Sequence, residues 1–229
     1  IEIKKKVKKG LMQELLTGKS KLSNSNGEWK EVKLGQVAKL TKGKDLSKGD
    51  LSPKGKFEAI HYGELFTKYG ESIENIHSRT DKYDKPFLSE TGDVLMPTSD
   101  VTPRGLSTAS CIQKDGVVLG GDILVIRPDS KRLDGLFFSF FVSSHRKHVM
   151  RLVSGTTVFH LYGSDLAKLT LLLPDVKKKK KITQILLSAN KEIDKLENKL
   201  KILKDQKKYL LNNLITGTIR TPETLSTPK

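Results

Sequence analysis

The chain has 229 residues, 36% of them hydrophobic and 30% charged, so it can form one good core with an appendage or two small domains. Its one cysteine, Cys111, excludes a disulfide framework, argues against a cysteine-based zinc site and is typical of a reducing compartment, so we expect a cytoplasmic protein. No apolar run approaches the ~20 residues of a membrane span and no signal-peptide pattern is present, which argues against membrane and secreted classes of protein.

The formal net charge of +16 is unevenly distributed along the chain. Residues 1–22 carry a net charge of +5 and residues 176–229 carry +9, which leaves +2 for the residues between them. Both ends are strongly basic, and this favours nucleic acid as a partner. The other interpretation is that the basic ends are simply solvated. The nearly neutral centre is compatible with either, because bases are read by polar groups rather than by net charge.

The predicted elements follow one another with clear changes of pattern. Residues 1–18 are typical of the last turns of a helix, and residues 19–27 form a polar linker rich in turn residues. Short β-type runs then alternate with turn residues, and the clearest of them cover residues 32–40, 92–96, 121–126 and 169–173. Two of these runs begin with Gly-Asp, a pair that supplies a turn before a buried strand. Apolar residues at helical spacing predict a core helix over residues 133–152.

After residue 177 the apolar residues recur at alternating spacings of four and three. Nine positions form this seam: Ile182, Leu186, Ala189, Ile193, Leu196, Leu200, Leu203, Leu210 and Leu214. So strict a repeat predicts a coiled-coil helix, about 55 Å long at 1.5 Å per residue. Such a helix needs a partner along its seam. The partner is either a copy of itself or the helix whose last turns begin the chain.

Two segments at opposite ends of the chain repeat each other. Residues 11–18 read LMQELLTG, and residues 210–217 read LLNNLITG. Both follow a Lys-Lys pair, and both end in Thr-Gly, where Gly accepts the left-handed conformation that closes a helix. The chain therefore has the layout of one unit from a repeating helix–domain–helix arrangement.

The fold class predicted from this pattern is α+β. A globular domain with a twisted β-sheet and small helices precedes a long coiled-coil-forming helix. The expected limits are a helix tail and linker at residues 1–22, the globular domain at 23–175, the long helix at 176–218 and a flexible tail at 219–229.

Parts of several enzyme motifs occur in the sequence, and none of these motifs is complete. Residues 18–20, Gly-Lys-Ser, resemble the end of a phosphate loop, but position 13 is not the first Gly of that motif. His145 and His148 have the spacing of metal ligands, yet no carboxylate or cysteine supports them. We therefore expect no catalytic residue, no metal site and no cofactor.

Three segments resemble a known family. The opening of the globular domain, EWKEVKLGQV at residues 28–37, is similar to the opening of target-recognition domains in Type I restriction–modification specificity subunits. Residues 153–157 (VSGTT) and 161–174 are similar to the end of those domains, and residues 10–19 to the end of the family's helical spacer. The resemblance covers nearly the whole chain. One departure is that the family usually has Pro-Leu-x-Glu-Gln after the last strand, whereas residues 174–179 read PDVKKK.

The resemblance implies a division of labour between subunits. Members of the family alternate two target-recognition domains with two long helices that pair antiparallel. The specificity subunit reads double-stranded DNA without catalysis, while methyltransferase subunits and restriction subunits dock on it. Each domain reads one half of a split target, and the helices set the distance between the halves. This chain would then be a half-size subunit, or the C-terminal half of one.

Polar loops contain the residues that we expect to contact DNA. One loop combines hydroxyls, an acid that can accept from cytosine and an arginine that can bind guanine, in Thr98, Ser99, Asp100, Thr102 and Arg104. A second offers hydroxyls and backbone N–H groups to phosphate, at Ser154, Gly155, Thr156, Thr157 and His160. A third suits backbone contact through Lys42, Lys44 and Lys48. The alternatives are, in the same order, an ordinary strand connection, a tight turn that closes the core and plain solvent exposure.

The leading hypothesis is thus a DNA-specificity subunit without enzyme activity, which forms a homodimer through antiparallel helices. A stand-alone dimeric DNA-binding regulator is the first alternative, because a coiled coil suffices for dimerisation. A coiled-coil adaptor that binds only proteins is the second, because the central domain is nearly neutral. A methyltransferase or nuclease fragment is the third, and the failed motifs disfavour it.

Overall fold

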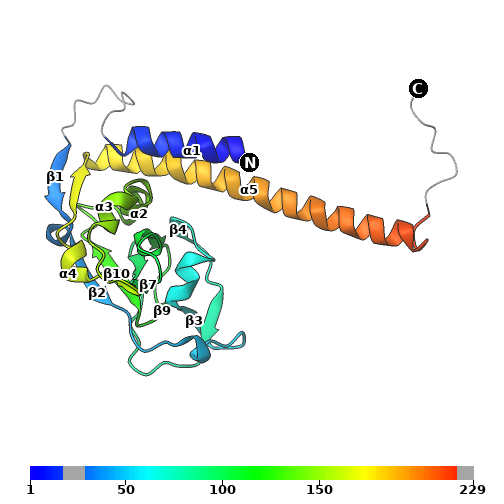
Figure 1. Cartoon of the computed structure of the whole chain (residues 1–229), viewed down its shortest axis with the longest axis horizontal. Coiled ribbons are helices and arrows are strands. Elements are labelled where there is room, and N and C mark those ends of the chain that lie inside the picture. The colour runs from blue at the N-terminus through cyan, green and yellow to red at the C-terminus, as the bar shows by residue number, and fades with distance from the viewer. Residues whose placement is uncertain (18–28, 221–229) are drawn as a thin grey trace. The chain divides into compact units, whose positions relative to one another are not determined.

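The structure, a computed structural model, describes residues 1–17 and 29–220 (Figure 1). Its sheets, short helices and long C-terminal helix confirm the α+β class expected from the sequence. The chain divides into two compact units, one of Lys9–Leu187 and one of Ile1–Lys8 with Ser188–Lys229. Among the described residues, no helix is both long and apolar enough to cross a membrane.

A five-stranded sheet forms the centre of the larger unit. Its strands are, in spatial order, β2 (Ala38–Lys42), β10 (Ile123–Pro128), β6 (Val94–Pro97), β8 (Ser110–Ile112) and β4 (Ser72–Ile73). Strand β10 runs antiparallel to both of its neighbours, while β4 and β8 pair in parallel. The strands predicted over residues 92–96 and 121–126 are β6 and β10, and each follows its Gly-Asp turn directly.

Three smaller sheets surround the central one. Their strands are β1 (Lys30–Lys33) with β12 (Thr170–Leu173), β7 (Ser99–Asp100) with β11 (Phe159–His160), and β5 (Ser78–Thr80) with β3 (Phe57–Ile60) and β9 (Val118–Leu119). The pair β1–β12 joins the first and last strands of the domain. The single strand predicted over residues 32–40 is wrong, because the 3₁₀ turn η1 (Leu34–Gln36) separates β1 from β2. The N–H groups of Leu34 and Gly35 donate to Leu169 and Ala167 instead of to a sheet neighbour.

The helices are α1 (Glu2–Leu15), α2 (Gly135–Ser144), α3 (Arg146–Met150), α4 (Gly163–Leu166) and α5 (Val176–Ile215). Further 3₁₀ turns are η2 (Lys48–Asp50), η3 (Tyr62–Phe66) and η4 (Gly105–Ser107). The core helix predicted over residues 133–152 is in fact two helices, α2 and α3. His145 separates them with a non-helical backbone (φ −111°, ψ 34°), and its ring stacks on Phe141 with 4.2 Å between ring centres.

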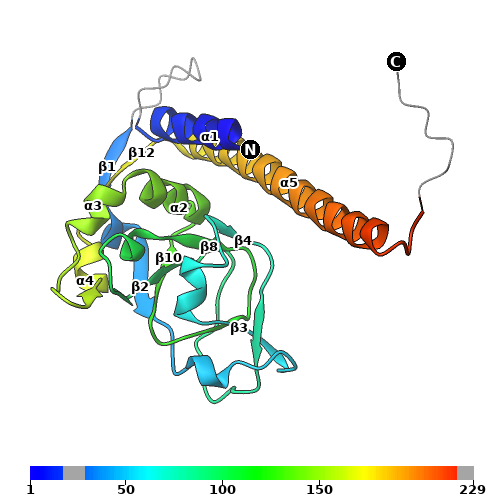
Figure 2. The same cartoon turned by 45° about the vertical axis from the view of Figure 1, so that its right-hand side comes forward.

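Both faces of the central sheet are covered. Strand β10 alternates, so that Leu124 and Ile126 belong to the cluster that contains α2, while Ile123 and Val125 belong to a second cluster. Figure 2 shows α2 lying along the sheet. Three of its phenylalanines belong to the first cluster and are among the largest fully buried side chains of the structure: Phe137, Phe138 and Phe140. The sequence therefore buries β10 on both faces, as a central strand requires.

The end of α1 is part of the core of the larger unit. Met12, Leu15 and Leu16 are buried in the same cluster as Ile182 and Leu186 of α5. Within the smaller unit, the start of α1 is joined to α5 by two ion pairs, Lys4–Glu192 at 2.7 Å and Lys5–Glu197 at 2.8 Å. The helix that begins the chain is thus a partner of α5.

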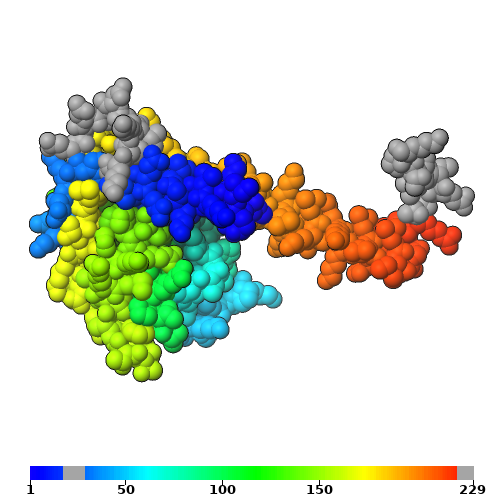
Figure 3. Space-filling view, turned by 45° about the horizontal axis from the view of Figure 1, so that its top comes forward, coloured from blue at the N-terminus to red at the C-terminus, as the bar shows by residue number. Residues whose placement is uncertain are grey.

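Exposure differs along the nine seam residues of α5. Ile182, Leu186 and Ile193 are buried, and Ala189 and Leu196 are half-buried. The last four are 41–51% exposed: Leu200, Leu203, Leu210 and Leu214. Figure 3 shows this last part of α5 in orange to red.

A buried carboxylate ties two strands of the central sheet together. Asp93, directly before β6, is 1% exposed and receives two hydrogen bonds of 2.8 Å from the guanidinium of Arg127 on β10. The backbone N–H of Glu90 donates a third, at 2.9 Å. Because a buried carboxylate is stable only when it is well paired, Arg127 supports the β6–β10 register.

We predict that Arg127→Met lowers the free energy of unfolding by about 2–4 kcal/mol, because Asp93 then stays buried without its cation. Urea unfolding followed by circular dichroism measures this. The matched control is Lys168→Met, which breaks the exposed Lys168–Asp165 pair and should change stability by about 0.5 kcal/mol or less. Equal effects of the two substitutions would contradict the role given to Arg127.

Candidate nucleic-acid interface

The candidate loops meet at one edge of the central sheet. In the register of the sheet, Ile123 at the start of β10 faces Pro97 at the end of β6, and Leu124 faces Lys42 at the end of β2. We call this end of the strands, where β2 and β6 end and β10 begins, the loop edge. The lysine-bearing loop that follows Lys42 and the hydroxyl-rich loop that follows Pro97 therefore leave the sheet on the same side.

The second candidate loop reaches the loop edge through a small sheet of its own. Phe159 pairs with Asp100 and His160 with Ser99, in the antiparallel pair β7–β11. On its other side, His160 exchanges two backbone hydrogen bonds with Ser154, of 2.8 and 3.0 Å. Two segments more than fifty residues apart in the sequence are thus joined, and the fold brings two of the three candidate groups side by side.

Thr98 has a supporting position in this arrangement. It is 4% exposed, and both its N–H and its hydroxyl donate to the carbonyl of Asp122, at 3.0 and 3.2 Å. Its own carbonyl accepts from the N–H of Leu161 at 2.9 Å. Thr98 therefore connects three segments of the loop edge, and its side chain has no surface to offer a ligand.

Asp100 holds the shape of the next turn. One carboxylate oxygen accepts from the N–H of Val101 and the other from the hydroxyl of Thr102, both at 2.8 Å. The Thr102 hydroxyl accepts in turn from the N–H of Gly105 at 3.2 Å. Any side chain at position 105 would overlap the Asp100 carboxylate, so Gly is required here. The exposed tip of the turn consists of Val101, Thr102 and Arg104.

The lysine-bearing loop is fixed by its backbone while its side chains are exposed. The N–H of Gly43 donates to Ile123 and that of Lys44 to Leu119, both at 2.9 Å. A side chain at position 43 would overlap the carbonyl of Gly120. Lys42, Lys44 and Lys48 are all exposed. The loop thus presents three exposed cations on a backbone that hydrogen bonds hold to the sheet.

The remaining candidates lie on an exposed turn. Residues Ser154, Gly155, Thr156 and Thr157 are exposed, and His160 is half-buried. Gly155 has φ +116°, a conformation that favours glycine. The turn closes a tight hairpin, which agrees with the alternative of a tight turn that the sequence left open. Its hydroxyls and backbone nevertheless face solvent.

Sequence reasoning missed an aromatic group beside these loops. Tyr62 and Phe66 begin and end η3, and His61 directly precedes it. The ring centres of His61 and Tyr62 are 4.5 Å apart, and those of Tyr62 and Phe66 are 6.3 Å apart. The ring of Phe66 lies against Gly105, and exposed Tyr162 stacks near His160. Aromatic residues in a strand-rich region are usually core residues, so their pattern alone carried no signal for this position.

A second missed residue is Arg146, at the start of α3. Burial is the main cause that lowers the pKa of its guanidinium, and the neighbouring guanidinium of Arg104 lowers it further. Helix α3 packs on η4, which follows Arg104 directly. Two like charges this close favour an anion beside them. The sequence placed Arg146 in a basic segment but could not pair it with Arg104.

The loop edge presents groups that can bind a polar ligand. It combines cations, hydroxyls and amide groups with the acids Asp100 and Asp122, so its charge is mixed. Among residues 1–17 and 29–220, no three His, Cys, Asp or Glu side chains lie close enough together to hold a metal ion. Hydrogen-bond donors and acceptors on rigid loops are what base reading uses.

Comparison with known proteins gives a consistent result. The family model described as Type I restriction modification DNA specificity domain matches residues 26–211. The chain is 22% identical to the Type I restriction enzyme MjaVIII specificity subunit of Methanocaldococcus jannaschii, over 96% of this chain and 55% of that protein. It spans about half the length of the curated relatives it matches.

Solved structures show the same fold. The crystal structure of the Type-I restriction-modification S subunit from M. genitalium matches with a TM-score of 0.65 and 18% identity, over 86% of this chain and 48% of that one. The HsdS subunit from Thermoanaerobacter tengcongensis matches with a TM-score of 0.58 and 15% identity, over 93% and 50%.

The neutral form of His61 caps η3, because the N–H of Gly63 donates to its Nδ1 at 3.2 Å. Burial is the main cause that lowers the pKa of His61 below its ordinary value. The unfolded chain therefore binds the proton more tightly, so this stability is present above pH ~6.5 and is lost as the pH falls through the folded pKa.

We predict that His61→Asn, which can accept the same hydrogen bond without titrating, reduces the loss of stability between pH 8 and pH 5. Urea unfolding of the two proteins at each pH measures the difference. His145, whose pKa burial also lowers, is present in both proteins and cancels. Parallel pH profiles would show that His61 is not the responsible group.

Proposed function

The chain belongs to the Type I restriction modification DNA specificity domain family, and we propose on this premise that it reads one half of a split DNA target without catalysis of its own. The observation that carries the proposal is the joining of two polar loops at the loop edge through β7–β11. These loops are held by backbone hydrogen bonds, so the side chains at their tips are presented in fixed positions.

Base reading is assigned to the tip of the turn between Asp100 and Gly105. Arg104 is exposed and can donate two hydrogen bonds to guanine, while Ser99 and Thr102 offer hydroxyls. Val101 is 71% exposed, although it is apolar, and a thymine methyl group would give it an apolar contact. Thr98 and Asp100 hold the turn in shape and are positioning residues in this proposal.

Contacts to the DNA backbone are assigned to the cations and the exposed turn. Lys42, Lys44 and Lys48 extend from a rigid loop at the same edge. Arg146, whose pKa is lowered in part by the neighbouring Arg104, can contact a phosphate. The turn at residues 154–157 can supply hydroxyls and backbone N–H groups, and His160 lies beside it. Such contacts fix the register of the protein on DNA without reading sequence.

The partners follow from the family. We propose that methyltransferase and restriction subunits dock on this chain in the cytoplasm, because its relatives are specificity subunits of Type I restriction enzymes. The exposed seam residues from Leu200 onward need a partner helix. We assign this role to a second copy of the chain, whose antiparallel α5 would give a homodimer with two identical reading domains and an interrupted palindrome as target.

Selection from a random duplex library, with and without the cognate methyltransferase subunits, tests the proposal. We expect enrichment of a split target only when the methyltransferase is present. Enrichment by this chain alone would instead support a stand-alone dimeric regulator. Absence of enrichment in both arms would refute DNA reading and leave an adaptor that binds only proteins.

Substitutions at the loop edge should separate base reading from backbone contact. We predict that Arg104→Ala weakens binding of the selected target by about 1–3 kcal/mol and relaxes the preference at one base pair. Lys44→Ala should weaken all duplexes alike and reduce the slope of log affinity against log salt by about 1. Fluorescence anisotropy over a salt series measures both effects.

The matched control is Lys114→Ala. Lys114 is an exposed lysine that follows β8, at the opposite edge of the central sheet from Pro97. It should leave affinity and salt dependence unchanged. If Lys114→Ala weakens binding as much as Lys44→Ala does, the interface is not confined to the loop edge.

A further inference from the structure

The sequence of α1 recurs at the end of α5, 199 residues later. We call residues 200–215 the end segment of α5. Beyond the repeated LMQELLTG motif, Ile1 and Ile3 correspond to Leu200 and Ile202, and Lys5 corresponds to Lys204. The repeat thus covers most of the apolar residues and lysines of α1. It differs at Lys4, Lys6 and Val7, which correspond to Leu203, Asp205 and Gln206.

Equivalent residues differ in burial in the two helices. In α1, Met12, Leu15 and Leu16 are 7%, 1% and 1% exposed. Their equivalents in the end segment, Leu211, Leu214 and Ile215, are 46%, 43% and 80% exposed. The same apolar pattern is therefore covered in one helix and uncovered in the other. Ile3 and Ile202 are exposed alike, at 77% and 57%, so this position belongs to neither covered face.

The surface that covers α1 is known from its neighbours. Within the larger unit, Met12, Leu15 and Leu16 pack in one cluster with Ile182 and Leu186, and Ile185 lies against that cluster. We call this surface the α1 seat. The α1 seat accepts large aliphatic residues at positions 12, 15 and 16, which lie on one face of a helix. Leu211, Leu214 and Ile215 have the same spacing and can fill it.

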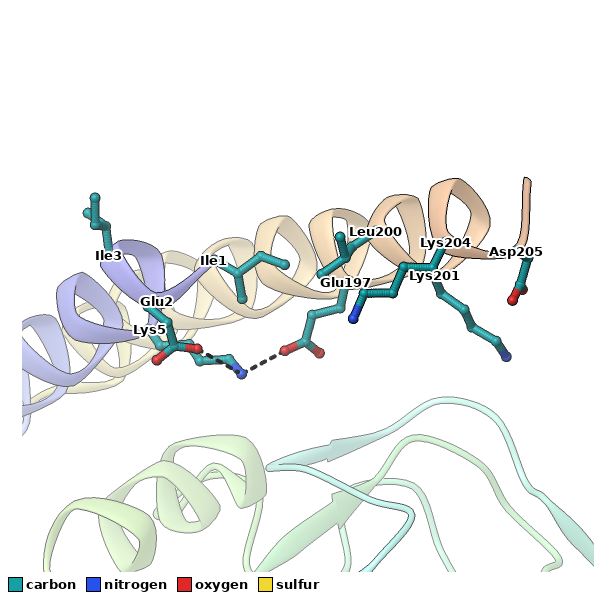
Figure 4. Close-up of a pocket in the computed structure, with 9 residues that line it drawn as sticks. All are labelled: Ile1, Glu2, Ile3, Lys5, Glu197, Leu200, Lys201, Lys204 and Asp205. Atoms are coloured by element: carbon teal, nitrogen blue, oxygen red, sulfur yellow. Dashed lines mark ion pairs between the residues drawn. The ribbon is translucent and has the colours of Figure 1, made fainter. Parts of the chain in front are cut away.

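One ion pair of α1, that of Lys5 with Glu197, can also be reproduced. Within the smaller unit, Lys5 donates to Glu197 at 2.8 Å and lies 3.8 Å from Glu2. Figure 4 shows Lys5 between these two carboxylates, with Leu200 and Lys204 on the adjoining turns of α5. A second copy that laid its end segment along this helix would bring its Lys204 to the place of Lys5.

We propose that α1 and the end segment of a second copy are alternative occupants of the α1 seat. The inference rests on the proposed pairing of antiparallel α5 helices and adds a regulator to it. Full pairing requires each copy to release its own α1, because one seat holds one helix. Since α1 is part of the same chain, its effective concentration is of the order of millimolar and it prevails when the protein is dilute. Displacement of α1 then controls dimer formation.

The test is a reversible lock on α1 in the full chain. Lys4→Cys combined with Glu192→Cys places two thiols where an exposed ion pair joins the helices, while Cys111 is buried and does not interfere. A bis-maleimide with a central disulfide joins the two thiols, so that the oxidised form is cross-linked and the reduced form is cleaved. Sedimentation equilibrium gives the dimer dissociation constant in the oxidised and the reduced form. We expect the oxidised form to dimerise at least about ten-fold more weakly, because a tethered α1 cannot leave its seat.

Two further variants change the end segment of α5. Leu211→Asp with Ile215→Asp changes exposed residues only, so the monomer should fold normally, and it should weaken the dimer of the reduced form by about ten-fold or more. Ile202→Asp is the matched control, because its equivalent Ile3 is not seated, and it should leave the dimer unchanged. Circular dichroism confirms that each variant is folded.

Each outcome decides a separate point. Equal dissociation constants for the oxidised and reduced forms would overturn competition by α1 while helix pairing stands. A monomer in every form would overturn both the helix pairing and the inference. Neither result affects DNA reading, which the duplex selection tests independently. A dimer weakened equally by Ile202→Asp and by the Leu211, Ile215 variant would place the contact elsewhere on α5.

Discussion

The register of β10 between β2 and β6 is the constraint on which the rest of the larger unit depends. Four consecutive aliphatic residues are buried on alternate faces, so a slip by one residue would move each of them into the wrong cluster. The Arg127–Asp93 pair supports the same register from the opposite edge. Because Ile123 then faces Pro97, and Lys42 follows on the other neighbour, the loops at the loop edge start from fixed points.

At the loop edge, one set of residues holds the loops in shape and another set is exposed. Thr98, Asp100 and Gly105 make the internal hydrogen bonds and close contacts, whereas Arg104 and Val101 are exposed at the tip. Exposed residues of this kind can change without disturbing the core, since they contribute little to its packing. The proposed reading of DNA would benefit from this arrangement, because rigid loops lower the entropy lost on binding.

The same apolar pattern is buried in one helix and exposed in another. The apolar residues of α1 are buried among neighbours of the same chain, and their repeats at the end of α5 are exposed. The apolar residues at the equivalent positions 12, 15, 16 and 211, 214, 215 are alike in kind, so their type does not explain the difference. What differs is the availability of a complementary surface, and such a surface is a property of the assembly and of the fold rather than of the helix.

The sequence by itself determined what depends on local pattern: the long helix with its seam, the Gly-Asp turns before β6 and β10, the α+β class and the family, because periodicity and turn chemistry act over a few residues. It also placed most of the loops that meet at the loop edge. Only the tertiary structure decided that Thr98 is buried, that residues 98–105 pair with residues 154–160, that Arg146 lies near Arg104 and that His145 divides a helix. These depend on hydrogen bonds and packing between residues far apart in the chain, which no local pattern encodes.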